Sequence, residues 1–476
     1  MSFQLWGVFV AANASTLSIS QGLLTSLKLN PKNPRVHSNK QIRQIAQSIE
    51  AFGFNVPILV DKNLNVIAGH GRVLAARSLE LNHVPIIHLE HLNEHQQRAF
   101  LLADNRLCEN ARWDDRLLGE QLQILAEAEL DFSLDVIGFE TSEIDLLIDG
   151  LSSASANDSD PADDIPEPQG PTVTHPGDVW QLGRHRIACA DSLRIESYQL
   201  MEGKLARAVI ADPPYNVQID GHASGLGKVR HRDFAMASGE MSSAEFTDFL
   251  SKAMKAAVAN SISGAINFYF MDWRHISEIL AAGKEAYPCL LNLCVWTKDN
   301  AGMGSFYRSG HELIFVFKNG NGKHQNNVQL GQFGRNRTNV WSYAGANSFS
   351  RSNSEGNLLA LHPTVKPVAL VSDAIMDCTS RGDIILDPFL GSGTTIIAAE
   401  RTRRICCGIE LDPRYVDTAI RRWQRFTGQS AVCAGSGEFF DARQENRMVC
   451  SGNEPDDLNV EQVRSTNKSL TPGGQQ

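Results

Sequence analysis

Residues 384–395 read IILDPFLGSGTT, a short apolar strand that runs through an acidic residue into a glycine-containing turn. Gly391 and Gly393 allow a tight turn and a close approach of the backbone to a ligand. The residues that follow, 394–401, are expected to form a helix. A strand, a glycine turn and a helix in this order form one unit of an α/β fold, whose ligands bind at the carboxyl ends of strands. The stretch therefore predicts an α/β domain with a ligand-binding loop that starts at Asp387.

The next expected strand, residues 404–409, ends in a second acid. Glu410 follows it directly, and an acid at this place can bind ribose hydroxyls. A dinucleotide-binding loop is the alternative, but the G-x-G-x-x-G fingerprint is incomplete because Ile396 stands where the third glycine should be. Asp387 is also a poor neighbour for a pyrophosphate and a good one for a sulfonium cation. The two acids favour a nucleoside cofactor that carries a positive charge.

A second loop with chemical character follows the expected strand 206–211. It reads Asp212-Pro213-Pro214-Tyr215, and its two prolines hold the chain extended and remove backbone donors. The Asp212 carboxylate and the Pro213 carbonyl can then accept both hydrogens of an exocyclic amino group, while Tyr215 offers a flat face for a base. A tight turn with a capping Asp is the plainer alternative, and only partner motifs distinguish the two.

Strands and helices alternate around these loops, which is typical of a parallel α/β sheet. The expected strands are 206–211, 265–270, 291–297, 313–318, 383–386 and 404–409, and the expected helices are 243–260, 367–378, 394–401 and 413–426.

The chain of 476 residues is too long for one ordinary core, so two or more domains are expected. Residues 151–176 are rich in Ser, Asp, Ala and Pro and predict a disordered linker with little packing across it. It separates a first domain, about 20–150, from a second, about 177–435. From 436 to 476 the polar composition predicts a disordered tail.

The composition is that of a globular protein, with 42% hydrophobic residues and a net charge of −10. Acid is concentrated in 158–167 and 438–461, whereas basic residues gather in stretches such as 228–232 and 421–425, so nucleic-acid binding is not excluded. The nine Cys form no C-x-x-C pair, which favours the cytoplasm and argues against disulfides and a metal site. No apolar run is long enough to cross a membrane.

The first domain is expected to be α+β with a helical extension. A helix is expected over 42–52, followed by two short strands, 57–60 and 66–68. The apolar spacing of residues 94–147 predicts a mainly helical segment. Between them, Gly69-His70-Gly71-Arg72 opens a helix over 73–81. A glycine turn at a helix start with an adjacent Arg is typical of an anion site, and a structural turn with a solvated Arg is the open alternative.

Residues 177–430 resemble the beta-class DNA amino-methyltransferases. The matching elements are Gly177-Asp-Val-Trp180, Ala190-Asp191-Ser192, Asp212-Pro-Pro-Tyr215, His311-Glu312, His362-Pro-Thr-Val-Lys366-Pro367, Asp387 to Thr395, and Gly408-Ile-Glu410. In this class the catalytic loop, here Asp212 to Tyr215, precedes the cofactor loop, here Asp387 to Thr395, and the sequence has the same order. The resemblance implies a Rossmann-like fold, S-adenosylmethionine as cofactor, and a flipped base of double-stranded DNA as substrate.

The resemblance also assigns roles to residues. The catalytic set is Asp212, Pro213, Pro214 and Tyr215, and residues 320–361 occupy the target-recognition position. The implied cofactor residues are Asp191, Ser192, Thr364, Lys366, Asp387, Phe389, Gly391, Ser392, Gly393, Thr394 and Glu410. Ala190 departs from the family's usual Gly. Asp at the start of the catalytic tetrapeptide favours adenine N6 as the target, with cytosine N4 as the alternative.

Residues 24–115 resemble the ParB-like domain. The matches are Leu29-Asn30-Pro31, Asn33-Pro34-Arg35, Ser48-Ile49, Phe52-Gly53, Pro57, Gly69-His70-Gly71-Arg72, Ala75-Ala76 and Ala103-Asp104-Asn105-Arg106. The resemblance implies nucleotide phosphate contacts at Gly69, His70, Gly71 and Arg72, and nuclease or nucleotide-hydrolase relatives.

The combination of the two domains resembles proteins of prophages and mobile elements, with the helix-turn-helix and dimer domains of partition proteins replaced by the methyltransferase. A role in restriction-modification is also expected. A DNA- or nucleotide-binding protein with secondary methylation is the second hypothesis. The oligomeric state stays open between a monomer and a homodimer.

Overall fold

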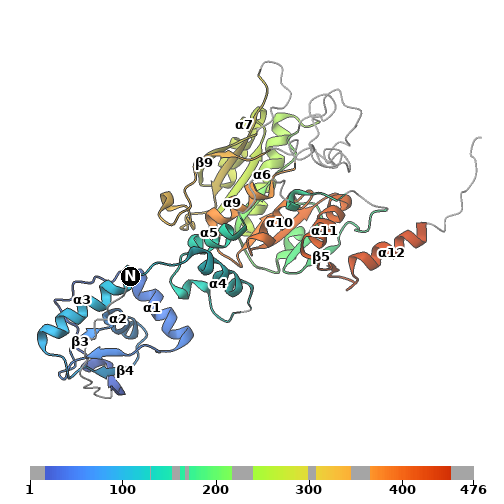
Figure 1. Cartoon of the computed structure of the whole chain (residues 1–476). Coiled ribbons are helices and arrows are strands. Elements are labelled where there is room, and N and C mark those ends of the chain that lie inside the picture. The colour runs from blue at the N-terminus through green and yellow to red at the C-terminus, as the bar shows by residue number, and fades with distance from the viewer. Residues whose placement is uncertain are drawn as a thin grey trace, which may run out of the picture. The chain divides into compact units, whose positions relative to one another are not determined.

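The computed structural model describes residues 17–128, 130–152, 161–166, 171–216, 240–298, 307–344 and 365–451. The chain divides into two compact units (Figure 1). Unit 1 comprises Met1–Ala156 with Gln332–Arg335, and unit 2 comprises Asn157–Gly331 with Asn336–Gln476. Each unit is described by itself.

Unit 1 contains a four-stranded sheet in the order β1-β4-β2-β3. Its strands are β1 (Ile19–Leu23), β2 (Ile58–Val60), β3 (Val66–Ala68) and β4 (His83–His88). Its helices are α1 (Asn39–Phe52), α2 (His70–Ser78), α3 (Glu94–Asn110), α4 (Asp115–Glu127) and α5 (Thr141–Ser152). Side chains cap three of these helices at their N-termini: Ser38 on α1, Asn93 on α3 and Asp114 on α4. The α+β domain with a helical extension is confirmed.

Unit 2 contains a ten-stranded sheet in the order β11-β9-β10-β8-β7-β12-β13-β6-β5-β14. Its strands are β5 (Val179–Leu182), β6 (His185–Cys189), β7 (Ala206–Ala211), β8 (Ser261–Met271), β9 (Cys289–Thr297), β10 (His311–Lys318), β11 (Val340–Ser342), β12 (Ile384–Asp387), β13 (Ile405–Glu410) and β14 (Val432–Cys433). Its helices are α6 (Ser243–Ala259), α7 (Ile276–Ala286), α9 (Val368–Cys378), α10 (Thr394–Arg401), α11 (Pro413–Thr427) and α12 (Phe440–Ser451).

The sheet of unit 2 is mixed, because its central strands and the edge pair β11–β9 are parallel and its other pairs are antiparallel. Strands β8, β7, β12, β13 and β6 run parallel to their neighbours in that order. On the flanks, β10 pairs antiparallel with β8 and β9, and β5 pairs antiparallel with β6 and β14. The α/β Rossmann-like fold is confirmed, while the purely parallel sheet expected from the alternation is corrected to a mixed one.

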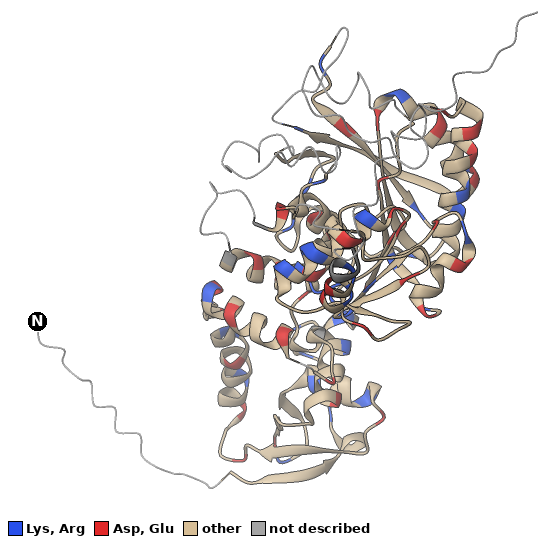
Figure 2. Ribbon diagram, turned by 90° about the vertical axis from the view of Figure 1, so that its right-hand side faces the viewer, with Lys and Arg blue, Asp and Glu red and all other residues tan. Residues whose placement is uncertain are grey.

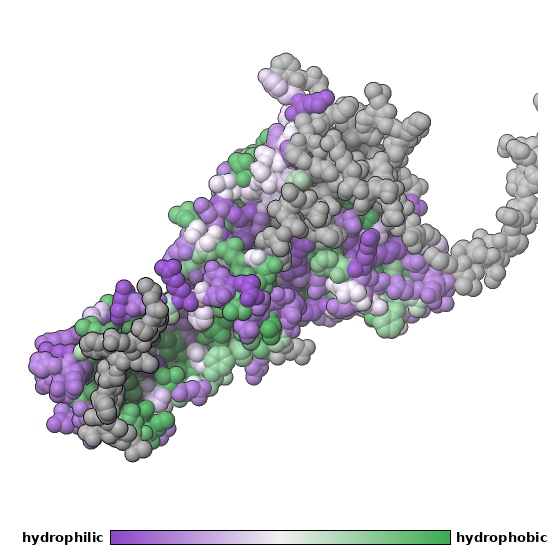
Figure 3. Space-filling view, in the orientation of Figure 1, coloured by the Kyte–Doolittle hydropathy of each residue, from purple (hydrophilic) through white to green (hydrophobic). Residues whose placement is uncertain are grey.

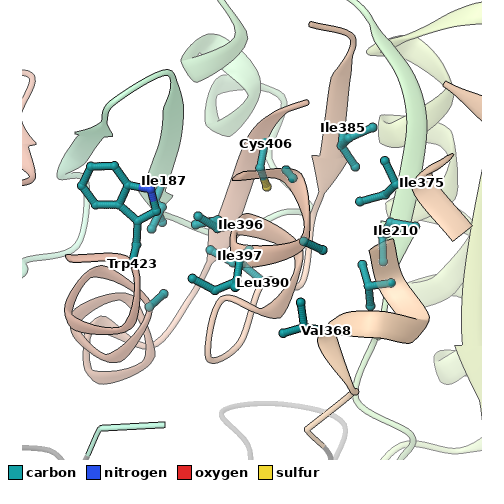
Figure 4. Close-up of a cluster of buried hydrophobic side chains, with 14 of the residues drawn as sticks. Ile187, Ile210, Val368, Ile375, Ile385, Leu390, Ile396, Ile397, Cys406 and Trp423 are labelled. Carbon is teal, nitrogen blue, oxygen red and sulfur yellow. The ribbon is translucent and has the colours of Figure 1, made fainter. Parts of the chain in front are cut away.

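Helices cover both faces of this sheet. Ala208 and Ile210 of β7 belong to one core cluster, and Val209 and Ala211 belong to another. Because successive side chains of a strand point to opposite faces, the two clusters lie on opposite sides of the sheet. Helices α9, α10 and α11 pack in the first cluster (Figure 4), and α6 and α7 pack in the second.

Two stretches of the expected linker, 161–166 and 171–176, are ordered parts of unit 2. Ala162, Ile165 and Val173 are buried, and the Asp417 carboxylate accepts hydrogen bonds from the backbone N–H groups of Val173 (2.7 Å) and Thr174 (3.0 Å). The expectation of disorder is therefore wrong for 161–166 and 171–176. The composition did not predict this order because the segment is held by hydrogen bonds of its backbone to residues far away in the sequence, such as Asp417. Residues 153–160 and 167–170 lie outside the described residues.

The expected tail is also ordered at its start. Phe440 of α12 is fully buried, and its ring packs edge-on against Trp180 with centroids 5.3 Å apart. Disorder from 436 is therefore wrong as far as Ser451, and the remaining residues lie outside the described part.

Charged residues of both signs are interspersed along the helices (Figure 2), and hydrophobic residues are scattered among hydrophilic ones on the face in Figure 3. Within the described ranges, no helix combines the length and the apolar character needed to cross a membrane. In the expected target-recognition region, Trp341 is buried and its indole N–H donates to the Thr338 carbonyl. Residues 345–361 of that region lie outside the described residues.

Candidate active site

The catalytic loop begins where β7 ends, and its polar groups form a buried network. The Lys366 ammonium donates to Asp212 Oδ2 at 2.6 Å and lies 3.2 Å from Glu312 Oε2. The Tyr215 hydroxyl lies 2.7 Å from Asp212 Oδ1 and 3.2 Å from Glu312 Oε2. Lys298 forms an ion pair with the other oxygen of Glu312. Two carboxylates and the Lys366 ammonium therefore meet at the tyrosine hydroxyl, and Lys298 extends the network from Glu312.

Burial and pairing shift the pKa values of this network in a consistent way. Burial raises the pKa of Asp212, the charge of Glu312 adds to the rise, and Lys366 opposes it. Burial would also raise the pKa of Glu312, but Lys366 and Lys298 outweigh it and lower that pKa to about 2. For Lys366, burial is outweighed by the two carboxylates, which raise its pKa. The lysine is thus held as an ammonium beside the catalytic carboxylate.

The cofactor loop begins where β12 ends, next to β7 in the sheet. The Asp387 carboxylate accepts hydrogen bonds from the Phe389 N–H (2.9 Å) and the Thr395 hydroxyl (2.5 Å). Burial raises the pKa of Asp387 to about 7. Gly393 caps α10 with φ of 85°, and a Cβ there would lie 2.7 Å from the Cβ of Ala419. Both the conformation and the space at this turn require glycine.

Glu410 connects the end of β13 to the glycine turn. Its Oε2 accepts a hydrogen bond from the Gly391 N–H and its Oε1 one from the Asp412 N–H, both at 2.8 Å. Burial raises the pKa of Glu410 to about 7. Two acids, the buried Asp387 and the half-buried Glu410, are thus held at the cofactor loop by backbone and hydroxyl donors.

Asp191 and Ser192 follow β6, whose Cys189 lies beside Glu410 in the sheet register. Asp191 Oδ1 accepts a hydrogen bond from the Leu193 N–H at 2.9 Å, and the Ser192 carbonyl accepts one from the Tyr198 hydroxyl at 2.8 Å. The loops after β6, β7, β12 and β13 therefore share one edge of the sheet, where ligands of α/β folds bind.

Most of the site residues expected from the sequence meet at this edge. Phe389 packs beside Phe249, with ring centroids 5.9 Å apart. Lys366 contacts Asp212 and Tyr215 of the catalytic loop and Glu312 of β10. Its expected place beside the cofactor stays a prediction. Thr364 lies outside the described residues.

Three further residues belong to the site without having been given a role. Glu312 lies in the His311-Glu312 pair that carried part of the resemblance, so a signal for it existed. No sequence motif indicated Lys298 or Arg422, because only the tertiary fold brings these residues to the loops.

The glycine turn of unit 1, where an anion site is expected, lies at the start of α2. The anion site itself stays a prediction. Gly69 adopts φ of 99° at the N-terminus of α2, and His70 is buried, with its Nε2 3.4 Å from the Asn30 backbone N–H. Arg72 Nη2 lies 3.4 Å from the Pro57 carbonyl, whereas its buried Nε has no hydrogen-bond partner among the described residues. Burial lowers the pKa of Arg72.

Three family models match the chain. The model for DNA methylases of the N6/N4 type matches residues 206–421, and the model for the ParB N-terminal domain matches 11–106. The third, the ParB-methyltransferase HTH domain, matches 116–176. This match contradicts the expectation that a methyltransferase replaces the helix-turn-helix, and it overlaps residues 151–176, which were expected to form a linker.

Similar proteins support the same division. The ParB-like nuclease domain-containing protein YnaK of Escherichia coli (strain K12) is 44% identical over 66 residues, which cover 14% of this chain and 76% of YnaK. The type II methyltransferase M.HpaI of Haemophilus parainfluenzae is 24% identical over 294 residues, 59% of this chain and 82% of that protein. Among solved structures, the cytosine-N4-specific PvuII DNA methyltransferase gives a TM-score of 0.40 at 16% identity, covering 57% of this chain and 94% of that one.

Proposed function

The chain belongs to the N6/N4 DNA methylases and carries a ParB-like domain before its methylase domain, and we propose that it transfers a methyl group from S-adenosylmethionine to adenine N6 in DNA. The observation that carries the proposal is the adjacency of two loops. Asp212 and Asp387 follow neighbouring parallel strands, β7 and β12. A group held by the first loop is therefore within reach of a cofactor held by the second.

The acids of the second loop fit this cofactor. A buried carboxylate with a raised pKa gains a favourable interaction from a cation, and the sulfonium is such a cation. Glu410 carries the acceptor oxygens that a ribose requires, and the turn at Gly393 has no room for a side chain. When bound, S-adenosylmethionine supplies an electrophilic methyl group, which leaves its sulfur with the electron pair of the broken bond.

The chain's own residues prepare the nucleophile. Asp212 and the Pro213 carbonyl accept the two hydrogens of the target amino group, which draws the nitrogen lone pair out of conjugation with the ring. Tyr215 stacks on the base, which must leave the duplex to reach this depth. The network of Lys366 and Glu312 holds the Asp212 carboxylate in place. The nitrogen attacks the methyl carbon in line and then loses a proton.

Adenine N6 is proposed over cytosine N4 because an Asp opens the catalytic tetrapeptide. Nucleosides from DNA treated with the protein and cofactor can be separated and identified by mass spectrometry. We expect N6-methyladenine. N4-methylcytosine without N6-methyladenine would reverse the choice of base and keep the reaction class.

The buried, unpartnered Arg72 Nε favours a second activity, nucleotide phosphate binding by the ParB-like domain. Calorimetry with nucleoside triphosphates should give binding heat that is lost in Arg72→Ala. Arg77→Ala is the matched control, because Arg77 lies exposed on the same helix. Equal heats for the parent and Arg72→Ala would reject the site.

A further inference from the structure

A short segment before the first strand of unit 2 is linked to both loops of the active site through Arg422 and the start of α9. This segment, residues 161–166, is named the connector here. Ala162 and Ile165 are 3% and 6% exposed, and Ala162 lies in the core cluster of α9, α10 and α11. Its contacts are therefore with the interior of the unit.

The first link runs from the connector to the cofactor loop through one arginine. The Arg422 side chain, 2% exposed, donates to the Ala162 carbonyl from Nη2 at 2.8 Å and from Nε at 3.3 Å. Its Nη1 donates to the Ser392 carbonyl at 3.3 Å and the Thr394 hydroxyl at 3.0 Å. A planar guanidinium fixes the directions of its donors. Arg422 thus sets the distance between the connector backbone and the glycine turn.

The second link runs from the connector to the catalytic lysine. Asp163 Oδ1 accepts a hydrogen bond from the Val368 N–H at 2.8 Å. Val368 is the first residue of α9, and the N-cap residue Pro367 supplies no side-chain cap. The carboxylate therefore caps the helix from a distant segment and complements its dipole. Lys366, whose ammonium binds Asp212, lies two residues before the capped residue Val368.

We propose that the connector positions both halves of the active site. Asp163 is a positioning residue for Lys366, and Arg422 is a positioning residue for the cofactor loop. The inference rests on the proposed function for its reaction, and it adds that the Asp163 link determines turnover and the Ala162–Arg422 link determines cofactor affinity.

The test uses the full-length chain and separates the two links. Asp163→Ala should lower kcat about tenfold at saturating DNA and cofactor, equivalent to about 1.4 kcal/mol of barrier, with cofactor affinity unchanged. Asp163→Asn should retain most of the rate, because its amide oxygen can accept the same N–H. Arg422→Lys should weaken cofactor binding about tenfold in calorimetry, with a smaller change in kcat at saturation.

Asp164→Ala is the matched control within the connector. Asp164 and Arg425 form a loose ion pair at 3.9 Å with side chains 38% and 66% exposed, so parent-like values are expected for both kcat and affinity. Thermal unfolding of every variant sets an assay temperature at which all are folded.

Three results would overturn the inference: parent-like kcat in Asp163→Ala, parent-like cofactor affinity in Arg422→Lys, or parallel losses of kcat and affinity in both variants. A parent protein that binds the cofactor but methylates no DNA would instead reject the proposed function. In that case, calorimetry on Arg422→Lys still decides the cofactor link, and the thermal shift on adding cofactor to Asp163→Ala still checks that this variant leaves the cofactor loop intact.

Discussion

The two loops of the active site begin alike and differ in what surrounds their acids. Asp212 and Asp387 each stand at the carboxyl end of a strand in the same sheet. Asp212 contacts the Lys366 ammonium, and a second carboxylate shares that ammonium. Asp387 is held by a hydroxyl and a backbone N–H. Among the described residues, no Lys or Arg forms an ion pair with Asp387 or Glu410.

The protein itself therefore balances the charge of Asp212, whereas a bound cation would be needed to balance the charges of Asp387 and Glu410. In the catalytic loop, the Asp212 carboxylate is already held by the Lys366 ammonium of the protein before any substrate binds. The acids of the cofactor loop have pKa values of about 7 because burial disfavours their charge. A cationic cofactor would relieve that penalty. The catalytic loop should therefore be sensitive to mutation of the protein's charges, and the cofactor loop to pH.

The largest effect is expected from Asp212→Ala. Removal of a group that contacts the amino nitrogen in the transition state typically lowers kcat about 100- to 1000-fold. Cofactor affinity should stay close to that of the parent, because Asp212 belongs to the neighbouring loop. Methyl transfer to DNA and calorimetry with S-adenosylmethionine measure the two quantities. A rate within about tenfold of the parent would contradict the role of Asp212.

Glu312→Gln tests how much the Glu312 carboxylate stabilises the buried Lys366 ammonium. The change leaves Lys366 and Lys298 with one carboxylate fewer, and breaking a buried pair typically costs about 3–5 kcal/mol of stability. Urea unfolding at pH 7 measures this loss. Glu285→Gln is the control, since its ion pair with Lys255 is exposed and its loss should lower stability much less.

The pH dependence of stability gives the same test a second readout. The pKa of Glu312 is lowered to about 2 in the folded protein, from an ordinary value of 4.5. The unfolded chain therefore binds more protons in this window, so the stabilisation is complete above the unfolded pKa and is lost as pH falls toward 2. Glu312→Gln should lack this part of the acid destabilisation. An unchanged acid profile would mean that Glu312 is not held as a charged partner.

Local patterns in the sequence were enough to locate both loops and several of their elements. Strand β7 occupies the expected residues 206–211, and α10 occupies 394–401. Strand β4 was missed because Pro85 lies within it, and proline is uncommon in paired strands. The connector was missed because hydrogen bonds such as Asp163 to Val368 join segments whose relation only the tertiary fold creates.

The smallest effect is expected from pH, and it concerns the cofactor loop alone. Asp387 and Glu410 have ordinary pKa values of 3.8 and 4.5, and burial raises both to about 7. Below pH 6 they are mainly protonated, so a sulfonium gains little from them, whereas above pH 8 they are ionised and attract it. Calorimetry should therefore show S-adenosylmethionine binding about tenfold tighter at pH 8 than at pH 6.

The matched ligand for this test is S-adenosylhomocysteine, which has the same groups and a neutral sulfur. Its affinity should change less over the same pH range, and the difference between the two ligands isolates the sulfonium. In Asp387→Asn, which leaves no charge at that position to ionise, the difference should shrink. Equal pH dependence for both ligands would mean that the acids of the cofactor loop meet the ribose or the backbone rather than the charged sulfur, and the contrast between the two loops would then rest on the catalytic network alone.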